Sequence, residues 1–280
     1  MRLDKIETFV VANPPPRHGG RYFIFLRLTT ACGITGVGEI YNATFGPDLC
    51  AAMAVEVFER HFEGSDPHHI EKLWRRTYGA GYTLRPDVTV MGVLSGLEMA
   101  CWDIIGKAAD KPVYELMGGR VHDRLRSYTY LYPLDGDVYP DPDTPYVYND
   151  PDIAAEVALA NVKKGFTAIK FDPAGPYSIY DGHQPRMADL DLSERFCKRL
   201  REAVGTRADL LFGTHGQFTV SGAKRLARRI EKYEPLWFEE PTTPENPADM
   251  AEIARFTSIP IATGERLCTK QEFARVLEAG

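Results

Sequence analysis

Cysteine is scarce in this 280-residue sequence, and no two cysteines are closely spaced. The five are odd in number and widely separated: Cys32, Cys50, Cys101, Cys197 and Cys268. This pattern argues against a disulfide framework and against a zinc knuckle. Cys101 falls in an apolar helical pattern and is expected to be a small core residue.

The sequence also shows no basic excess, and neither a secretory leader nor a long apolar run is expected. A formal net charge of −6 argues against a nucleic-acid-binding surface. The first residues, MRLDKIETFVV, carry charges at positions 2, 4, 5 and 7, where a leader has an apolar core. No apolar run is expected to reach the roughly 20 residues that span a bilayer. We therefore expect a cytoplasmic protein with neither a nucleic-acid nor a membrane partner.

What the sequence does have is a globular composition, 44% hydrophobic and 26% charged, in a chain long enough for two domains. Residues 1–125 carry both strand and helix patterns. A strand is expected at 1–12, a hairpin over 21–41, and helices at 47–62, 66–78 and 88–109. Gly92 and Gly96 in the last helix are expected to allow close packing.

Residues 126–280 alternate strictly between strand and helix patterns, which is typical of an α/β fold with parallel strands. The strands are expected at 126–132, 166–172, 209–213, 236–240 and 260–265. The helices are expected at 152–165, 191–205, 219–233, 246–257 and 269–280. Both a doubly wound sheet and a (β/α)₈ barrel of the TIM type fit this alternation.

Polar residues at the ends of these strands favour the barrel. They are Lys170, Asp172, His215, Glu239 and Glu265. In a barrel such ends converge on one face, whereas an open sheet would be expected to carry a glycine-rich phosphate turn after its first strand. A barrel of eight strands takes about 250 residues. The five strands expected here leave the barrel incomplete, with the rest expected beyond residue 280.

Two of these acids have a spacing that suggests a metal site. Glu239 and Glu265 lie 26 residues apart, and Gly213 lies a further 26 residues before them, each at a predicted strand end. A single glutamate at such a position is more often a solvated rim residue, but two at matched heights suit Mg²⁺, which prefers oxygen ligands. Glu240, on the other side of its strand, is expected to form a salt bridge with the helices.

Four segments together resemble the enolase superfamily, in its mandelate racemase branch. They are VMGVLSGLEMACWDIIGKAADKPVYELMGG (90–119), GFTAIKF (165–171), PLWFEEP (235–241) and IPIATGERL (259–267). Three more resemble the galactonate dehydratase-like acid-sugar dehydratases in particular: HGQ (215–217), ENPADMAEIARFTSIPIATGERL (245–267) and KQEFARVLEAG (270–280). The resemblance covers the whole chain and implies an α+β capping domain with a modified (β/α) barrel.

The resemblance implies abstraction of the proton α to a carboxylate, with the enediolate held by Mg²⁺. Of the family's three acidic ligands, Glu239 and Glu265 match the second and the third. The first would be an aspartate where this chain has Gly213. We therefore expect weakened Mg²⁺ binding, and we expect Gly213→Asp to tighten it. His215 could also reach the ion, although imidazole is a poor Mg²⁺ ligand.

The catalytic residues that the resemblance implies are His215 and Lys170. His215 would be the general acid that protonates the leaving hydroxyl in a β-elimination. Lys170 matches the first lysine of a Lys-x-Lys pair and would bind the substrate carboxylate, although a structural ion pair is an equally open interpretation. Asp172 stands in place of the second lysine, which weakens a racemase interpretation. The family's His–Asp base is expected beyond residue 280.

Substrate specificity is implied to lie in the capping-domain loops, at residues 13–21 and 41–46. The expected substrate-binding residues are Arg17, Tyr22, Asp172 and Arg266. The function implied first is dehydration of a sugar acid. A racemase, epimerase or cycloisomerase of the same superfamily stays open, as does an impaired homologue that binds a sugar acid without turnover. The resemblance also implies a homo-oligomer.

Overall fold

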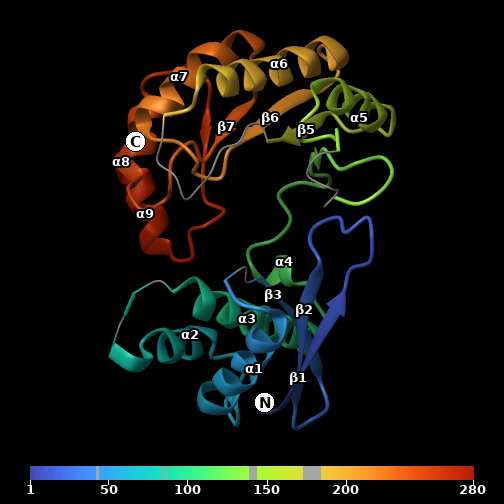
Figure 1. Ribbon diagram of the computed structural model, residues 1–280. Helices are drawn as coiled ribbons and strands as arrows, with labels where there is room; N and C mark the ends of the chain where they lie inside the picture. The colour runs from blue at the N-terminus through green and yellow to red at the C-terminus, as the bar shows by residue number, and fades with distance from the viewer. Residues whose placement is uncertain (42–43, 83, 86, 139–143, 173–183) are drawn as a thin grey trace. The chain divides into compact units, whose positions relative to one another are not determined.

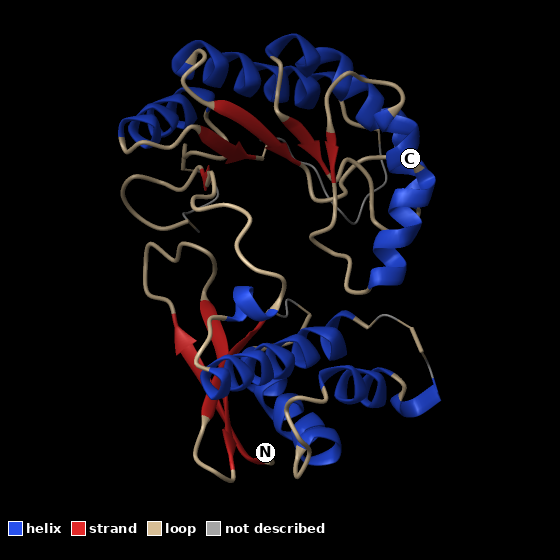
Figure 2. Cartoon of the chain, turned by 180° about the vertical axis from the view of Figure 1, so that it is seen from behind, coloured by secondary structure: helices blue, strands red, loops and turns tan. Residues whose placement is uncertain are grey.

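The computed structural model describes residues 1–41, 44–82, 84–85, 87–138, 144–172 and 184–280. It divides into two compact units, Met1–Arg124 and Leu125–Gly280 (Figures 1 and 2). Each unit has its own β-sheet, three-stranded in the first and five-stranded in the second.

The first unit is built on an antiparallel sheet in which β2 is the central strand. The strands are β1 (Leu3–Ala12), β2 (Tyr22–Thr30) and β3 (Thr35–Ile40), which confirms the expected strand and hairpin. Alternate residues of β2, namely Ile24, Leu26 and Leu28, are fully buried. Side chains of a strand point to opposite faces in turn, so this alternation gives the sheet one apolar face for the helices to cover.

The helices of the first unit are α1 (Pro47–Val57) with a π-helical turn at Phe58–Phe62, α2 (Ile70–Tyr78), a 3₁₀ turn at Ala80–Tyr82, α3 (Val88–Ala109) and α4 (Val113–Leu116). Helices α1 and α3 pack against the sheet, and α2 and α4 pack against α3. The side chain of Asp87 accepts hydrogen bonds from the N–H groups of Thr89 and Val90, and so caps the start of α3. The helix ends at Asp110, which adopts a left-handed conformation with φ of 51°.

Helix α3 lies unusually close to β3 because glycines meet at the contact. A Cβ atom on Gly38 would lie 1.9 Å from the carbonyl oxygen of Gly96, and a Cβ on Gly96 would lie 2.7 Å from Cγ1 of Ile40. Real Cβ atoms do not approach other atoms so closely, so a side chain at either position would force helix and strand apart. The close packing expected from Gly96 is confirmed.

The expectation that no apolar run reaches the length of a membrane span is wrong for α3. This helix has 22 residues, and its most apolar stretch has a mean hydropathy of 1.5. Half of that stretch is buried inside the protein, where α3 packs on the sheet. A buried core helix meets the same criteria of length and composition as a membrane span.

The second unit is a parallel sheet whose strands follow one another in space in chain order. The strands are β4 (Thr129–Tyr130), β5 (Ala168–Phe171), β6 (Asp209–Gly213), β7 (Trp237–Glu239) and β8 (Ile261–Ala262). A doubly wound sheet reverses its strand order at a switch point, whereas a barrel does not. The order therefore agrees with the expected TIM-type barrel, although the described residues form an open sheet and no closed barrel.

Helices follow each strand and cover one face of this sheet (Figure 2). They are α5 (Pro151–Lys163), α6 (Met187–Val204), α7 (Val220–Ile230) with a 3₁₀ turn at Glu231–Tyr233, α8 (Pro247–Ala254) and α9 (Lys270–Ala279). The expected alternation is confirmed, and the bounds of β6 are those predicted. The strands expected at 126–132 and 260–265 are longer than the two-residue ladders of β4 and β8, which lie at the sheet's edges.

The two faces of this sheet carry different chemistry. On one face Phe171, Phe212 and Phe238 stand in a row, with edge-to-face ring centroids 5.5 and 5.4 Å apart. All three are fully buried within the apolar core that the helices close. Lys170 and Glu239 are each one residue away from a phenylalanine, so they point to the opposite face. The strands are thus anchored by aromatic side chains on one face and present charged groups on the other.

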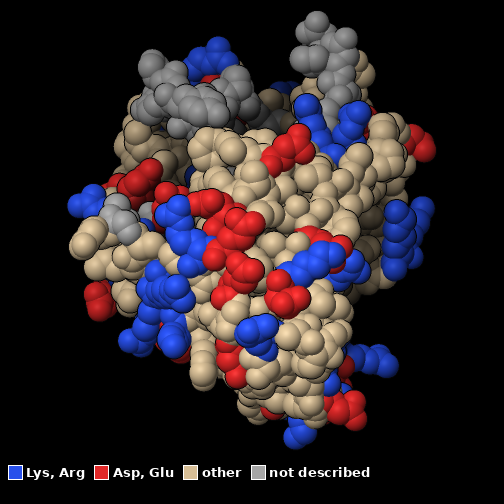
Figure 3. Space-filling model, turned by 90° about the horizontal axis from the view of Figure 1, so that it is seen from below, with Lys and Arg blue, Asp and Glu red and all other residues tan. Residues whose placement is uncertain are grey.

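On the face of the molecule drawn in Figure 3, acidic and basic side chains are interspersed. This mixture agrees with the modest net charge of −6 and is the pattern of a solvated surface. The expectation that the protein has no nucleic-acid partner stays a prediction.

Candidate active site

The central feature of the strand ends is an ion pair between β5 and β7. Nζ of Lys170 lies 2.6 Å from Oε1 of Glu239, and both side chains are largely buried, with exposed fractions of 11% and 14%. The indole Nε1 of Trp237 donates a hydrogen bond of 3.0 Å to Oε2 of Glu239. Both carboxylate oxygens of this predicted metal ligand therefore accept from protein donors.

The missing side chain at Gly213 lets Lys170 reach Glu239. Neighbouring strands lie about 4.8 Å apart, so Lys170 must cross the whole width of β6 to reach β7. A Cβ atom on Gly213 would lie only 3.2 Å from Cε of Lys170. Burial acts to lower the pKa of the Lys170 ammonium, but the hydrogen bond and the charge of Glu239 outweigh it, so the pKa is raised.

Asp172 fills the rest of the space at Gly213. Its Oδ1 lies 2.7 Å from the position of a Cβ on Gly213. This oxygen is buried and has no hydrogen-bond partner among the described residues. Burial, followed by the negative charge of Asp172, raises the pKa of Tyr130, whose hydroxyl lies beside that carboxylate. Asp172 thus already occupies the space that the side chain of Gly213→Asp would enter. The substitution would therefore have to displace Asp172 before it could tighten Mg²⁺ binding.

His215 lies between two acids that come from other strands. Its Nδ1 is 3.4 Å from Oδ2 of Asp172, and its Nε2 is 3.9 Å from Oε2 of Glu265. The hydrogen bond to Asp172 contributes most to raising the pKa of the imidazole, and it outweighs the effect of burial. The backbone of His215 is left-handed, with φ of 52°, a conformation that non-glycine residues adopt chiefly at constrained sites.

Glu240 has a different partner from the one expected. It is only 1% exposed, and it pairs with the guanidinium of Arg266, at 2.7 Å from Nε and 2.6 Å from Nη2. The expected salt bridge with the helices is therefore wrong, because Arg266 follows β8. The role of Arg266 in substrate binding stays a prediction, and its guanidinium already neutralises a buried carboxylate.

The other two expected substrate-binding residues belong to the first unit. Arg17 lies in the loop after β1 with φ of 58°, and Tyr22 is the first residue of β2. Their role stays a prediction. Of the expected loop residues, 42–43 lie outside the described part of the chain.

Trp237 was not among the expected site residues. Its apolar neighbours made it look like part of a buried strand. The signal that could have found it is the two-residue period of a strand, which places Trp237 and Glu239 on the same face.

The acids at the strand ends offer the type of ligand atom, oxygen, that a hard divalent cation prefers. Asp172, Glu239 and Glu265 offer carboxylate oxygens, and Oδ1 of Asp172 lacks a partner. Within the described ranges, however, no three Asp, Glu, His or Cys side chains gather closely enough to hold an ion. A cation at Glu239 would have to displace Lys170 or Trp237 from that carboxylate.

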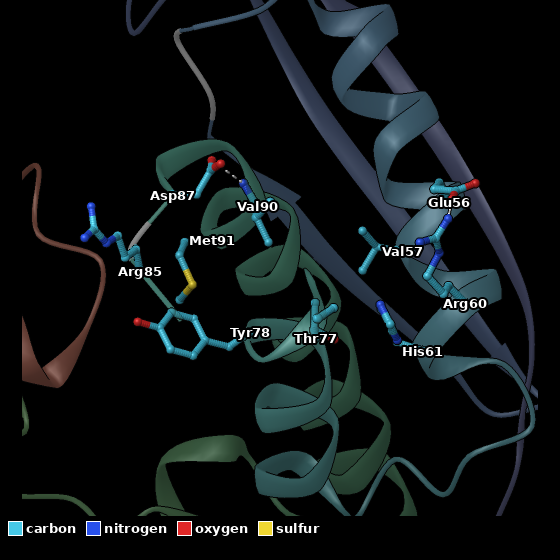
Figure 4. A pocket seen from close by; sticks show the side chains of 11 residues that line it. Glu56, Val57, Arg60, His61, Thr77, Tyr78, Arg85, Asp87, Val90 and Met91 are labelled. Atoms are coloured by element: carbon cyan, nitrogen blue, oxygen red, sulfur yellow. Dashed lines mark hydrogen bonds and ion pairs between the residues drawn. The ribbon is translucent and has the colours of Figure 1, made fainter. Parts of the chain in front are cut away.

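A separate cavity of about 230 Å³ lies within the first unit (Figure 4). Arg60, His61, Tyr78 and Met91 are among the residues that line it. The buried Nδ1 of His61 has no hydrogen-bond partner among the described residues. None of the site residues expected from the sequence lines this cavity, so it does not bear on the chemistry at the strand ends.

Comparison with known protein families gives two matches that together cover most of the chain. Residues 5–118 match the family described as mandelate racemase/muconate lactonizing enzyme, N-terminal domain. Residues 152–280 match the family described as enolase C-terminal domain-like.

Individual proteins and solved structures similar to this chain carry names from the same family. A D-galactonate dehydratase from Ralstonia pickettii (strain 12J) is 32% identical over all 280 residues, and the chain spans 65% of that protein's length. A solved structure from Labrenzia alexandrii DFL-11 that carries the mandelate racemase/muconate lactonizing enzyme name is 76% identical, with a TM-score of 0.94 over 100% of this chain and 70% of that one. A mandelate racemase/muconate lactonizing enzyme from Jannaschia sp. CCS1 is 52% identical, with a TM-score of 0.92 over 100% of this chain and 71% of that one.

Proposed function

The chain belongs to the mandelate racemase/muconate lactonizing enzyme family, and on this premise we propose that the protein dehydrates a sugar acid. The reaction removes the proton α to the carboxylate and then expels the β-hydroxyl as water, which leaves a 2-keto-3-deoxy acid. The relatives named D-galactonate dehydratase support this reaction class, because they match the whole of this chain.

The observation that carries the proposal is the meeting of Asp172, His215 and Glu265 at the ends of three different strands. The leaving hydroxyl needs a proton, and His215 is the proposed donor. Asp172 holds Nδ1 and so fixes the plane of the ring, which leaves Nε2 to deliver the proton. Glu265 lies on the Nε2 side, and its negative charge stabilises the protonated form of His215.

Lys170 is proposed to stabilise the charge that develops on the substrate carboxylate when the α proton leaves. Its side chain is largely buried, so the ammonium acts in a medium where charge interactions are stronger than in water. Glu239 and Glu265 are the residues expected to hold Mg²⁺, and a bound ion would supply further positive charge at the same carboxylate. Trp237 would orient Glu239 through its indole N–H.

The test is a dehydration screen with the whole protein and a panel of aldonic and aldaric acids, with detection of the keto acid. We expect one or more of the acids to be dehydrated, and His215→Gln to lower kcat about 10²- to 10⁴-fold, as for loss of a general acid. His122→Gln is the matched control, because His122 is exposed and lies in the first unit. Equal turnover by the two variants would remove His215 from the mechanism.

The same screen in D₂O separates the alternatives. Exchange of the α proton without loss of water would indicate a racemase or epimerase. Binding of a sugar acid with neither exchange nor dehydration would indicate an impaired homologue.

A further inference from the structure

We infer that Thr214 is a positioning residue, which fixes the turn that carries His215 by joining the end of β6 to the end of β7. The inference rests on the proposed function, since that function makes His215 the proton donor. Thr214 stands between Gly213, the last residue of β6, and His215. It is polar but fully buried, so its hydroxyl needs a partner inside the protein.

The hydroxyl of Thr214 finds its partners on the neighbouring strand. Oγ1 lies 3.0 Å from the carbonyl oxygen of Glu239 and 2.9 Å from that of Glu240, and it donates its single proton to this pair of acceptors. The backbone N–H of Thr214 also donates to the carbonyl of Glu239, at 3.1 Å. Thr214 thus extends the contact between the two strands one step beyond their last register pair, Gly213 with Glu239.

The backbone on both sides of this contact adopts a conformation that needs support. His215 has φ of 52° and Glu240 has φ of 43°, both in the left-handed region that residues with a side chain seldom adopt. Such residues persist where surrounding contacts over-determine them. The hydroxyl of Thr214 is a contact of this kind, because Thr214 precedes one of the two residues and binds the carbonyl of the other.

The far side of the turn is held by Gly216. Its N–H donates to the carbonyl of Glu240 at 2.6 Å. Thr214 and Gly216 therefore bind the same carbonyl group from the two sides of His215. The imidazole is presented from the residue between these two contacts.

Loss of the hydroxyl should loosen this turn more than it destabilises the unit. In Thr214→Val the carbonyl of Glu239 keeps the N–H of residue 214, and the carbonyl of Glu240 keeps the N–H of Gly216, so neither is left without a donor. Valine also keeps the branched shape of threonine in the buried space. A positioning role therefore predicts a displaced His215 in a protein that still folds.

Thr242 offers a matched control on the segment that follows β7. It is only 3% exposed, and its Oγ1 has no hydrogen-bond partner among the described residues. Its carbonyl oxygen lies 3.1 Å from the position of a Cβ on Gly216, so Thr242 lies against the same turn. Thr242→Val thus removes a hydroxyl from the same surroundings without removing a hydrogen bond.

The experiment is an NMR measurement on the whole protein with ¹³C-labelled histidine, which does not depend on turnover. The ring signal of His215 is assigned with His215→Gln. We expect Thr214→Val to shift or broaden this signal while the signals of the other histidines stay in place. Thr214→Ser, which keeps the hydroxyl, should restore the signal of the wild type, and Thr242→Val should leave it unchanged.

Turnover of a sugar acid that the wild type dehydrates gives a second readout. We expect Thr214→Val to lower kcat about 10- to 100-fold with little change in KM, since misplacing a reacting group by about 1 Å can cost about 10²-fold. Thr214→Ser should recover most of this loss.

Two results would overturn the inference. One is a His215 signal in Thr214→Val that matches the wild type, and the other is a Thr214→Ser variant that behaves like Thr214→Val, because the hydroxyl would then have no role. If Thr214→Val does not fold, Thr214→Ala is compared with Thr214→Ser in its place. If the wild type dehydrates no sugar acid, the proposed function fails, but the His215 signal still decides whether Thr214 positions the ring.

Discussion

The ammonium of Lys170 meets the carboxylate of Glu239 at 2.6 Å across the end of an intervening strand. The residue between them, Gly213, has no side chain, and a Cβ there would lie 3.2 Å from Cε of Lys170. Lysine and a divalent cation are both positive, so they compete for the same carboxylate oxygens. The pair would therefore link the stability of the unit to binding of the proposed Mg²⁺.

The first prediction concerns that competition. Lys170→Met leaves the carboxylate of Glu239 buried without its cation, and the loss of one partner from a buried pair costs about 3–5 kcal/mol. We expect a lower melting temperature in EDTA and a larger rise on adding Mg²⁺ than in the wild type. Differential scanning calorimetry of the whole protein measures both.

The matched control for this prediction is Lys224→Met. Lys224 forms a pair with Glu252 at 2.6 Å, but the glutamate is 55% exposed, so its loss should cost no more than about 1 kcal/mol. If Lys170→Met responds to Mg²⁺ no more than Lys224→Met does, Lys170 does not compete with the ion.

The second prediction concerns the buried pair of Glu240 and Arg266. Arg266→Met leaves a carboxylate that is 1% exposed without its counter-charge, and it should lower the free energy of unfolding by about 3–5 kcal/mol. Adding Glu240→Gln should recover part of the loss, because the uncompensated charge is then gone. Urea denaturation of the two single variants and the double variant gives the coupling energy. Strict additivity of the two changes would show that the pair is not coupled.

The third prediction concerns the glycine contact between α3 and β3. Gly38→Ala places a Cβ 1.9 Å from the carbonyl oxygen of Gly96, so helix and strand must separate. We expect a loss of about 1–3 kcal/mol or more in the free energy of unfolding, measured in urea. Gly46→Ala is the control, because nothing lies within 4 Å of its Cβ position and its φ is −63°. A comparable loss in the control would point to a general effect of replacing glycine.

The fourth prediction concerns acid stability. The side chain of His68 lowers the pKa of Asp66 to about 2, helped by the backbone N–H of His68 and by the N-terminal amine. Because the folded pKa lies below the ordinary value of 3.8, Asp66 contributes stability above pH 4 that is lost as the pH falls toward 2. Asp66→Asn should therefore flatten the fall in unfolding free energy between pH 4 and 2. If the unfolding free energy of Asp66→Asn falls between pH 4 and 2 as steeply as that of the wild type, Asp66 does not contribute to acid stability.

Much of the fold follows from pattern alone. The apolar period of α3 and the short apolar run of β6 predict both elements with their observed bounds. The ends of such segments are sharp because a cap or a glycine stands there, as Asp87 does at α3 and Gly213 at β6. Strands β4 and β8 are shorter than predicted, because a strand's length is set by the partner it pairs with, and each has a pairing strand on one side only.

The positions of the polar residues at strand ends could be predicted from the sequence, but their contacts could not. Lys170, Asp172, His215, Glu239 and Glu265 stand at strand ends, which the order of strands and helices reveals. Lys170 on β5 pairs with Glu239 on β7, and Gly213 on the strand between them has no side chain. This pairing is visible only when three strands are considered together. The partner of Glu240 depends on the path of the chain after β8. Neither contact can be predicted from the residues next to it in the sequence.

The row of phenylalanines on the helix-covered face also bears on how such a protein can change over time. Phe171, Phe212 and Phe238 hold the strands from behind, while the residues beside them point the other way. A change at position 170, 213 or 239 therefore leaves those anchoring contacts intact. Substitutions at these strand ends can therefore change the charged groups on one face while the aromatic contacts that hold the strands together stay in place.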